Sequence, residues 1–308
     1  MRSRQGSIRL FRFSGIDVFL HWSWFLVGVF EIQSRAGTYS SIAWNVLEYV
    51  ALFLIVTLHE FGHALACRQV GGRADTIVLW PLGGVAYVDP PPRPGATLWS
   101  ITAGPLVNLI LVPVLLGIGT FIKSSGLAAT TPDLIHLVRS VAWINIALFV
   151  FNVLPVYPLD GGQILRSLLW FILGRARSLM VASVFGFLGV AGFIYFAVRV
   201  GDAWLGFIAL YMGVNCWTGF KQAQALSQLA KLPRRTGYSC PTCKSSPPIG
   251  DYWRCHNCGQ AFDTFATGAV CPNCHSRFDV TRCPDCGRQH PLSEWAGQTI
   301  MVPNPVLK

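Results

Sequence analysis

Charged side chains are scarce in this sequence. Aspartate, glutamate, lysine and arginine make up 12% of the 308 residues, about half of the roughly 25% usual in soluble globular domains. Hydrophobic residues make up 52%, and the mean hydropathy is +0.46. This composition excludes the soluble globular class, and we expect a membrane protein.

The apolar residues fall into six long blocks: 16–31, 42–68, 97–122, 134–155, 178–199 and 203–218. A helix needs about 20 apolar residues to cross the core of a bilayer, and the first and last blocks are short but adequate. No small-residue cleavage site follows the first block, so we interpret it as a retained span rather than a signal peptide. The sequence predicts an α-helical polytopic membrane protein with about six transmembrane helices.

Basic residues predict the orientation of these helices. Four arginines precede the first block, and further lysines and arginines follow the second, fourth and sixth, whereas the opposite loops hold few. Such a bias places both termini in the cytosol. We expect an integral, multi-pass protein of a prokaryotic cell membrane. The net charge of +10 could alternatively indicate a surface that binds nucleic acid, but we do not expect nucleic acid as a partner.

Cysteine divides the chain. Eight of the ten cysteines form four CxxC pairs: Cys240 and Cys243, Cys255 and Cys258, Cys271 and Cys274, Cys283 and Cys286. Two such pairs fill the four corners of a structural zinc site, so eight thiolates predict two structural zinc ions. Disulfides are the alternative, but a cytosolic tail lies in a reducing compartment. The simplest pairing is sequential, the first pair with the second and the third with the fourth, and an interleaved pairing stays open.

These observations predict three parts. Residues 1–220 form the membrane domain, 221–236 a linker helix, and 237–308 a tandem zinc-ribbon domain in the cytosol. The tail is poor in large apolar residues, so zinc is expected to supply much of its folding free energy. The spacing of its cysteines does not indicate whether the tail binds a protein, a nucleic acid or neither. We expect a cytosolic protein partner rather than nucleic acid.

The stretch HEFGH at 59–63 places three polar side chains inside the second apolar block. On a helix His59 and His63 share one face and can hold a metal together, with Glu60 within reach of a metal-bound water; this is the H-E-x-x-H pattern of zinc peptidases. Ionisable side chains at membrane depth are costly and face a polar site. The competing interpretation is a pair of core histidines with a paired glutamate.

A catalytic zinc ion takes three protein ligands and keeps one open position. The candidates for the third ligand in apolar surroundings are His21, Glu48, Cys67, His136 and Asp160. Glu48 lies eleven residues before His59, about 16 Å along a helix, and is too far away. Asp160 follows a break made by two prolines and precedes Gly161–Gly162, so it can be presented from irregular backbone. Its alternative role is a helix N-cap.

HEFGH, followed about a hundred residues later by NVLPVYPLDGG, resembles the site-2 protease family of intramembrane zinc metalloproteases. AGPLVN at 103–108, WPLGGVAYV at 80–88 and HW at 21–22 agree with that resemblance, which covers roughly residues 12–220. It implies that His59, His63 and Asp160 bind the catalytic zinc and that Glu60 is the base. It also implies polar helpers near the site, for oxyanion or substrate contacts, at Asn108, Asn145 and Asn152; their alternative role is interhelical hydrogen bonding.

Residues 76–88 read as two short strands with a turn around Gly83 and Gly84. Their free edge could hold an extended substrate by β-augmentation, or the segment could merely cover the site. We therefore expect a zinc endopeptidase that cleaves transmembrane helices of other proteins within the lipid bilayer. The alternatives are a catalytically silent scaffold that recruits a cytosolic partner through its ribbons, and a metal transporter, which would need polar residues at several depths.

Overall fold

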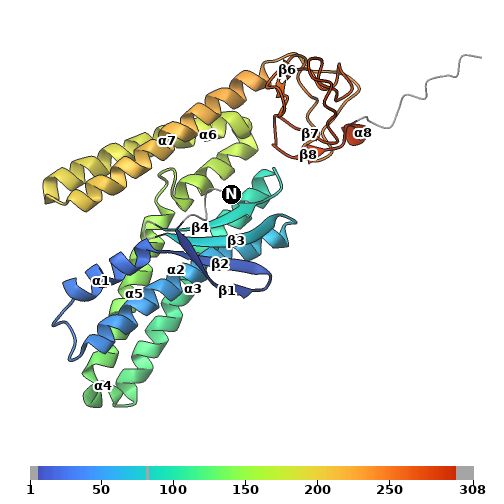
Figure 1. Ribbon diagram of the computed structural model, residues 1–308. Helices are drawn as coiled ribbons and strands as arrows, with labels where there is room; N and C mark the ends of the chain where they lie inside the picture. Colours follow the sequence, from blue (N-terminus) through green and yellow to red (C-terminus); the bar gives the residue numbers. More distant parts are fainter. Residues whose placement is uncertain (1–5, 81–82, 296–308) are drawn as a thin grey trace, which may run out of the picture. The chain divides into compact units, whose positions relative to one another are not determined.

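The computed structural model describes residues 6–80 and 83–295, and the chain divides into two compact units, 1–221 and 222–308. Helix α7 (Ala203–Ala230) begins in the first unit and ends in the second. Residues 221–230 of the segment expected to form a separate linker helix are the last part of α7, and residues 231–236 are not helical. Figure 1 shows the elements along the chain. Each unit is described by itself.

The first unit contains a four-stranded sheet in the order β1-β2-β3-β4. Its strands are β1 (Ser7–Phe13), β2 (Ile16–His21), β3 (Arg73–Trp80) and β4 (Gly83–Asp89). Strands β2 and β3 run parallel, and the other two pairs are antiparallel. Ser14 and Gly15 both have positive φ, 49° and 75°, as a two-residue type I′ hairpin requires.

The helices of the first unit pack beside this sheet and against one another. In chain order they are α1 (Ser23–Ser34), α2 (Ile42–Gln69), α3 (Pro94–Ser124), α4 (Leu127–Thr130), α5 (Pro132–Val153) and α6 (Asp160–Val200), followed by α7. Within the described residues, α2, α3, α5 and α6 are long and apolar enough to cross a membrane. Helix α6 is broken at Gly174, whose φ of 76° and ψ of 171° are not helical.

The expected first span, 16–31, is wrong. Residues 16–21 are strand β2, and α1 has 12 residues, which at 1.5 Å per residue gives about 18 Å against a bilayer core of roughly 30 Å. The alternation of apolar and polar residues before and after Ser14–Gly15 is typical of a hairpin, whereas the expectation of a span rested on the length of the apolar block alone. The expected last span, 203–218, lies in α7, which is not among the four helices that qualify.

The hairpin expected at 76–88 is present as β3 and β4, and its connection at 81–82 lies outside the described residues. One face of the sheet packs on the second half of α2. Alternate residues of β2 and β3, such as Ile16, Val18 and Ile77, are fully buried there against Phe61 and Ala64 of the helix. Because strand side chains alternate between faces, this packing fixes the sheet directly beside HEFGH.

The second unit has little regular structure. It contains the two-residue strands β5 (Trp253–Arg254), β6 (Ala261–Phe262), β7 (Thr281–Arg282) and β8 (Gln289–His290), and the short helix α8 (Leu292–Trp295). Strands β5 and β6 pair, as do β7 and β8. Two small clusters of buried cysteine and aromatic side chains form its core.

Candidate active site and cysteine metal sites

Helix α2 places His59, Glu60 and His63 in the buried interior of the first unit. All three are less than a tenth exposed. The two imidazoles lie one turn apart on one face, and their Nε2 atoms are 3.0 Å apart. A helix that faced lipid here would leave three polar side chains without partners, so their burial marks a polar site inside the first unit.

Asp160 reaches the same point from the other side of the site. Helix α5 ends at Val153 and α6 begins at Asp160, so residues 154–159 form the irregular connection expected from the prolines. Gly161 and Gly162 leave no room for a side chain, because a Cβ at Gly162 would lie 2.6 Å from Cα of Tyr157. This close turn brings Asp160 Oδ2 to 3.1 Å from His59 Nε2 and 3.4 Å from His63 Nε2.

The far nitrogen of each imidazole is held by an oxygen acceptor. His59 Nδ1 lies 2.6 Å from Asn108 Oδ1, and His63 Nδ1 lies 2.9 Å from the backbone carbonyl of Ser100. Carbonyl oxygens only accept, so in the neutral imidazoles Nδ1 carries the proton and the Nε2 lone pair stays free. Two Nε2 atoms and one carboxylate oxygen therefore converge, and these residues fit a zinc ion with one coordination position left open.

Asn108 and Asn145 support His59 rather than line an open cavity. Asn108 donates from Nδ2 to Asn145 Oδ1 at 2.8 Å, and Asn145 donates from Nδ2 to the Asn108 carbonyl at 2.9 Å. Both residues are fully buried. Their polar atoms are thus engaged with protein groups, which disfavours a direct contact to an oxyanion or substrate. The structure gives Asn152, in the last turn of α5, no side-chain partner among the described residues, and it is partly exposed.

Glycines allow α3 to approach His59 and His63 closely. A Cβ at Gly104 would lie 2.8 Å from His59 Nε2, with the His63 ring nearer still, and one at Gly62 would lie 2.7 Å from the Ala103 carbonyl. These contacts are shorter than van der Waals distances, so α2 and α3 meet where both lack side chains. The small residues of AGPLVN therefore have a steric role beside the two histidines.

Glu60 is held by the sheet. Its Oε2 accepts a hydrogen bond of 2.9 Å from the backbone amide of Ala86 in β4, and the residue is 5% exposed. Strand β4 has β3 on one side and is the last strand of the sheet. Gly83 and Gly84 begin β4, paired with Trp80 and Leu79 of β3.

The other sequence-derived ligand candidates lie outside this group. His21 stacks on Trp80 with ring centroids 3.8 Å apart. Glu48 accepts hydrogen bonds from Arg35 and from Tyr39, the latter at 2.6 Å. Cys67 is buried in the apolar core beneath the sheet, and His136 is exposed. Of the five candidates, Asp160 alone joins the histidines in a metal-binding arrangement within the described residues.

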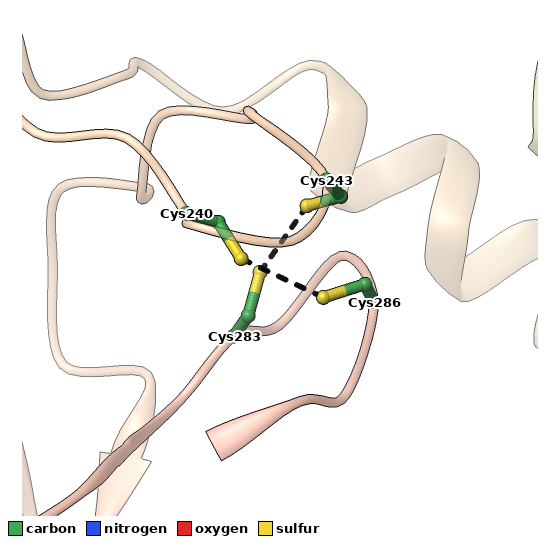
Figure 2. A group of neighbouring side chains, drawn as sticks. All are labelled: Cys240, Cys243, Cys283 and Cys286. Atoms are coloured by element: carbon green, nitrogen blue, oxygen red, sulfur yellow. Dashed lines mark hydrogen bonds between the residues drawn. The ribbon is translucent and has the colours of Figure 1, made fainter. Parts of the chain in front are cut away.

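The eight tail cysteines form two groups of four. The first group contains Cys240, Cys243, Cys283 and Cys286. Figure 2 shows the sulfur atoms of this group pointing toward one another from two loops. Cys255, Cys258, Cys271 and Cys274 make the second. Sulfur–sulfur distances across the groups are 3.5 to 3.7 Å. A tetrahedral zinc ion with bonds of about 2.3 Å separates its sulfurs by about 3.8 Å, so both groups fit zinc with no open position.

The expected sequential pairing of the CxxC motifs is wrong, and the interleaved alternative is also not observed. The first motif meets the fourth and the second meets the third, so one site is nested inside the other. Each motif forms the same local turn, in which the first cysteine carbonyl accepts from the amide four residues later. The local turn is readable from sequence, but the pairing depends on packing, including a 2.9 Å hydrogen bond from Trp253 Nε1 to the Arg282 carbonyl.

Two groups that hold the site were not found from the sequence, the Ser100 carbonyl and the Ala86 amide. Both are backbone atoms, and any residue type supplies them. The nearest signals were the position of Ser100 four residues before Gly104 on α3 and the strand pattern that contains Ala86. Neither signal distinguishes these atoms from their neighbours.

Comparison with known proteins agrees with this geometry. The model of peptidase family M50 matches residues 48–131 and 122–196. A zinc metalloprotease of Methanocaldococcus jannaschii is 36% identical over 182 residues, which cover 58% of this chain and 50% of that protein. Rip3 of Mycobacterium tuberculosis is 32% identical over 232 residues, 67% of this chain and 56% of that protein.

Among solved structures, the site-2 protease from Methanocaldococcus jannaschii matches with a TM-score of 0.52 and 29% identity. The match covers 70% of this chain and 95% of that one. The chain spans about half the length of the two curated relatives. The match to the family model ends at residue 196, before the cysteine-rich tail begins.

Proposed function

The chain belongs to peptidase family M50, the family of the site-2 proteases, and from this premise we propose that it is a zinc-dependent intramembrane endopeptidase. Its substrates would be membrane proteins, cleaved within or near their transmembrane helices. The observation that carries the proposal is the convergence of His59, His63 and Asp160 beside a buried Glu60, on helices apolar enough to span a membrane.

Zinc bound by the two histidines and Asp160 would lower the pKa of a coordinated water and polarise the scissile carbonyl. Glu60, the neighbour of His59 on α2, would accept a proton from the attacking water and return it to the leaving amine. Asn108 and Ser100 would keep both imidazoles in the tautomer that leaves Nε2 free. Asn152, rather than Asn108 or Asn145, is our candidate for a hydrogen bond to the developing oxyanion.

Strand β4 is our candidate for the substrate-binding edge. A peptide bond in a helix is shielded by its own hydrogen bonds, so a substrate has to be held in an extended form. A segment that pairs with β4 would meet the same edge whose Ala86 amide contacts Glu60. Gly83 and Gly84 would then face its backbone without side chains. Retained cleavage in a folded Gly84→Pro variant would argue against this pairing.

We further propose the organisation expected from the sequence: a membrane protease domain at 1–220, a linker at 221–236 and a cytosolic zinc-ribbon domain at 237–308, with both termini in the cytosol of a prokaryotic cell. One catalytic and two structural zinc ions would be bound. The two CxxC groups leave no open coordination position, which supports a structural role for their metal.

The proposal is tested by comparing protein ends in membranes from cells that express the wild type or Glu60→Gln. The substitution removes the base and leaves the three metal ligands in place. We expect new ends within apolar segments of membrane proteins only with the wild type. Asp75→Asn, which alters an exposed carboxylate on β3, is the matched control and should give wild-type ends. Identical ends with Glu60→Gln would favour the silent-scaffold alternative.

A further inference from the structure

The cysteine-rich unit contains a cavity of about 340 Å³ between its two hairpins. Strand β5 and its partner β6 contribute Trp253 and Phe262, and β7 contributes Thr281. Phe278, between the hairpins, packs on Phe262 with ring centroids 5.5 Å apart. This volume is at the lower end of the roughly 300–1,000 Å³ of small-molecule sites, enough for one large side chain and its neighbours rather than a large cofactor.

The lining combines an apolar floor with a cationic rim. Tyr252 and Val280 at the rim are 46% and 44% exposed, as an apolar contact surface would be. Arg254 and Arg282 also line the cavity and are exposed, and neither makes an ion pair with a described residue. None of the lining residues is acidic. A ligand with an apolar group and adjoining negative charge is therefore complementary to the site.

Thr281 supplies an independent observation that points to a ligand. The residue is 2% exposed, it lines the cavity, and its hydroxyl has no hydrogen-bond partner in the described structure. Buried polar atoms in proteins are nearly always paired, and a hydroxyl can both donate and accept. A bound backbone amide or carbonyl would satisfy it.

Nucleic acid is less suited to this surface. Residues 222–295 carry eight lysines and arginines and five aspartates and glutamates. Each zinc ion with four thiolates adds about two negative charges, so the unit as a whole is not cationic. Nucleic-acid binding depends on an extended basic surface that neutralises several phosphates, whereas here two cations flank one apolar cavity.

We propose that this cavity, the ribbon pocket, binds a short peptide segment of a partner protein that carries one large apolar side chain next to acidic residues. The apolar side chain fills the space over Phe262 and Phe278, the acidic groups pair with Arg254 and Arg282, and the peptide backbone bonds to the Thr281 hydroxyl. The site is separate from the metal centre of α2, and the proposal stands whether or not the protein is a protease.

The test uses the purified full chain with its zinc and a library of fluorescent octapeptides, in which a central Phe, Leu or Ser is flanked by Glu, Gln or Lys. We expect binding of peptides with a central Phe or Leu flanked by Glu, and at least tenfold weaker binding when Ser or Lys replaces either feature. No binding of any acidic, apolar peptide at millimolar concentration would overturn the proposal, as would tighter binding of a labelled single-stranded oligonucleotide.

Variants separate the pocket from general charge and folding effects. Arg254→Glu combined with Arg282→Glu should weaken peptide binding more than tenfold, whereas Arg277→Glu, an exposed arginine outside the pocket, should not. Thr281→Val removes the unpaired hydroxyl and keeps the shape, so it should preserve or raise the melting temperature and yet weaken binding. Equal affinity in the Arg254/Arg282 double variant and in Arg277→Glu would refute the assignment.

Discussion

Replacing Asn108 with alanine should weaken the metal site without touching a metal ligand. The side chain is fully buried and makes two hydrogen bonds, to His59 Nδ1 at 2.6 Å and to Asn145 at 2.8 Å. Alanine leaves the His59 N–H without its acceptor, so the imidazole loses the contact that fixes its tautomer and orientation. Loss of such a contact typically lowers metal affinity 10- to 100-fold, or about 1.4 to 2.8 kcal/mol.

The variant also costs folding free energy. Asn145 Oδ1 loses the hydrogen bond that it accepts from Asn108 Nδ2, and a buried polar group left unpaired costs about 1–3 kcal/mol. Asn145→Ala removes the hydrogen bonds between Asn145 and Asn108 and leaves the bond from Asn108 to His59. Its effect on zinc affinity should therefore be smaller. Asn215→Ala, at a partly exposed position of α7 far along the chain from the site, is the matched control for the loss of an amide side chain.

Equilibrium dialysis of the purified chain against buffered zinc, with ions counted per chain, measures the effect. The binding curve of bound zinc against free zinc has one step for each site, and the step that Asp160→Ala abolishes belongs to the ion at the α2 site. The steps of the ions in the tail serve as an internal reference. We expect that step to shift to 10- to 100-fold higher free zinc in Asn108→Ala, less in Asn145→Ala, and not in Asn215→Ala. Unchanged affinity in a folded Asn108→Ala protein would refute the positioning role.

Three further outcomes follow from the packing. Gly104→Ala should abolish zinc binding at the α2 site, since its Cβ would collide with both imidazoles, whereas Gly117→Ala on the same helix meets open space and should bind normally in the same dialysis. Tyr39→Phe removes a hydrogen bond to the buried Glu48 carboxylate, and thermal unfolding in detergent should show a loss of about 1.5–3 kcal/mol; an unchanged melting temperature would count against that bond. In the tail, serine at all four cysteines of one group should leave one tail zinc ion, whereas sequential pairing predicts none; the four are Cys240, Cys243, Cys283 and Cys286.

The convergence of His59, His63 and Asp160 was predictable from the sequence because its signals are local. H-E-x-x-H defines one helix face, and the prolines and glycines around Asp160 define where a chain can leave a helix inside a membrane. Asn108 and Asn145 were also named from the sequence, but their role was not predictable. An amide that contacts substrate and one that orients a histidine have the same local pattern, and only the distance to His59 Nδ1 distinguishes them.

Two features escaped prediction for the same physical reason. Strand β2 has four apolar residues in six, because it is buried on α2 with β3 beside it, and the apolar helix α1 follows it directly. The length of the combined apolar block therefore did not distinguish a strand and a short helix from one membrane span. The nested pairing of the CxxC motifs depends on contacts between hairpins, such as that of Trp253 with the Arg282 carbonyl. In both cases the partner lies far away in the sequence, and residue type gives no information on which partner it is.

The central claim is that one metal centre on α2 and α6 performs proteolysis with Glu60 as its base. The most direct test measures two quantities in parallel for the wild type, Glu60→Gln and Asp160→Ala: the number of zinc ions per chain and the new termini (ends) of cleaved membrane proteins. The account predicts three ions and new ends for the wild type, three ions and no ends for Glu60→Gln, and two ions and no ends for Asp160→Ala. Wild-type ends from a Glu60→Gln protein, or an undiminished zinc content in Asp160→Ala, would contradict it.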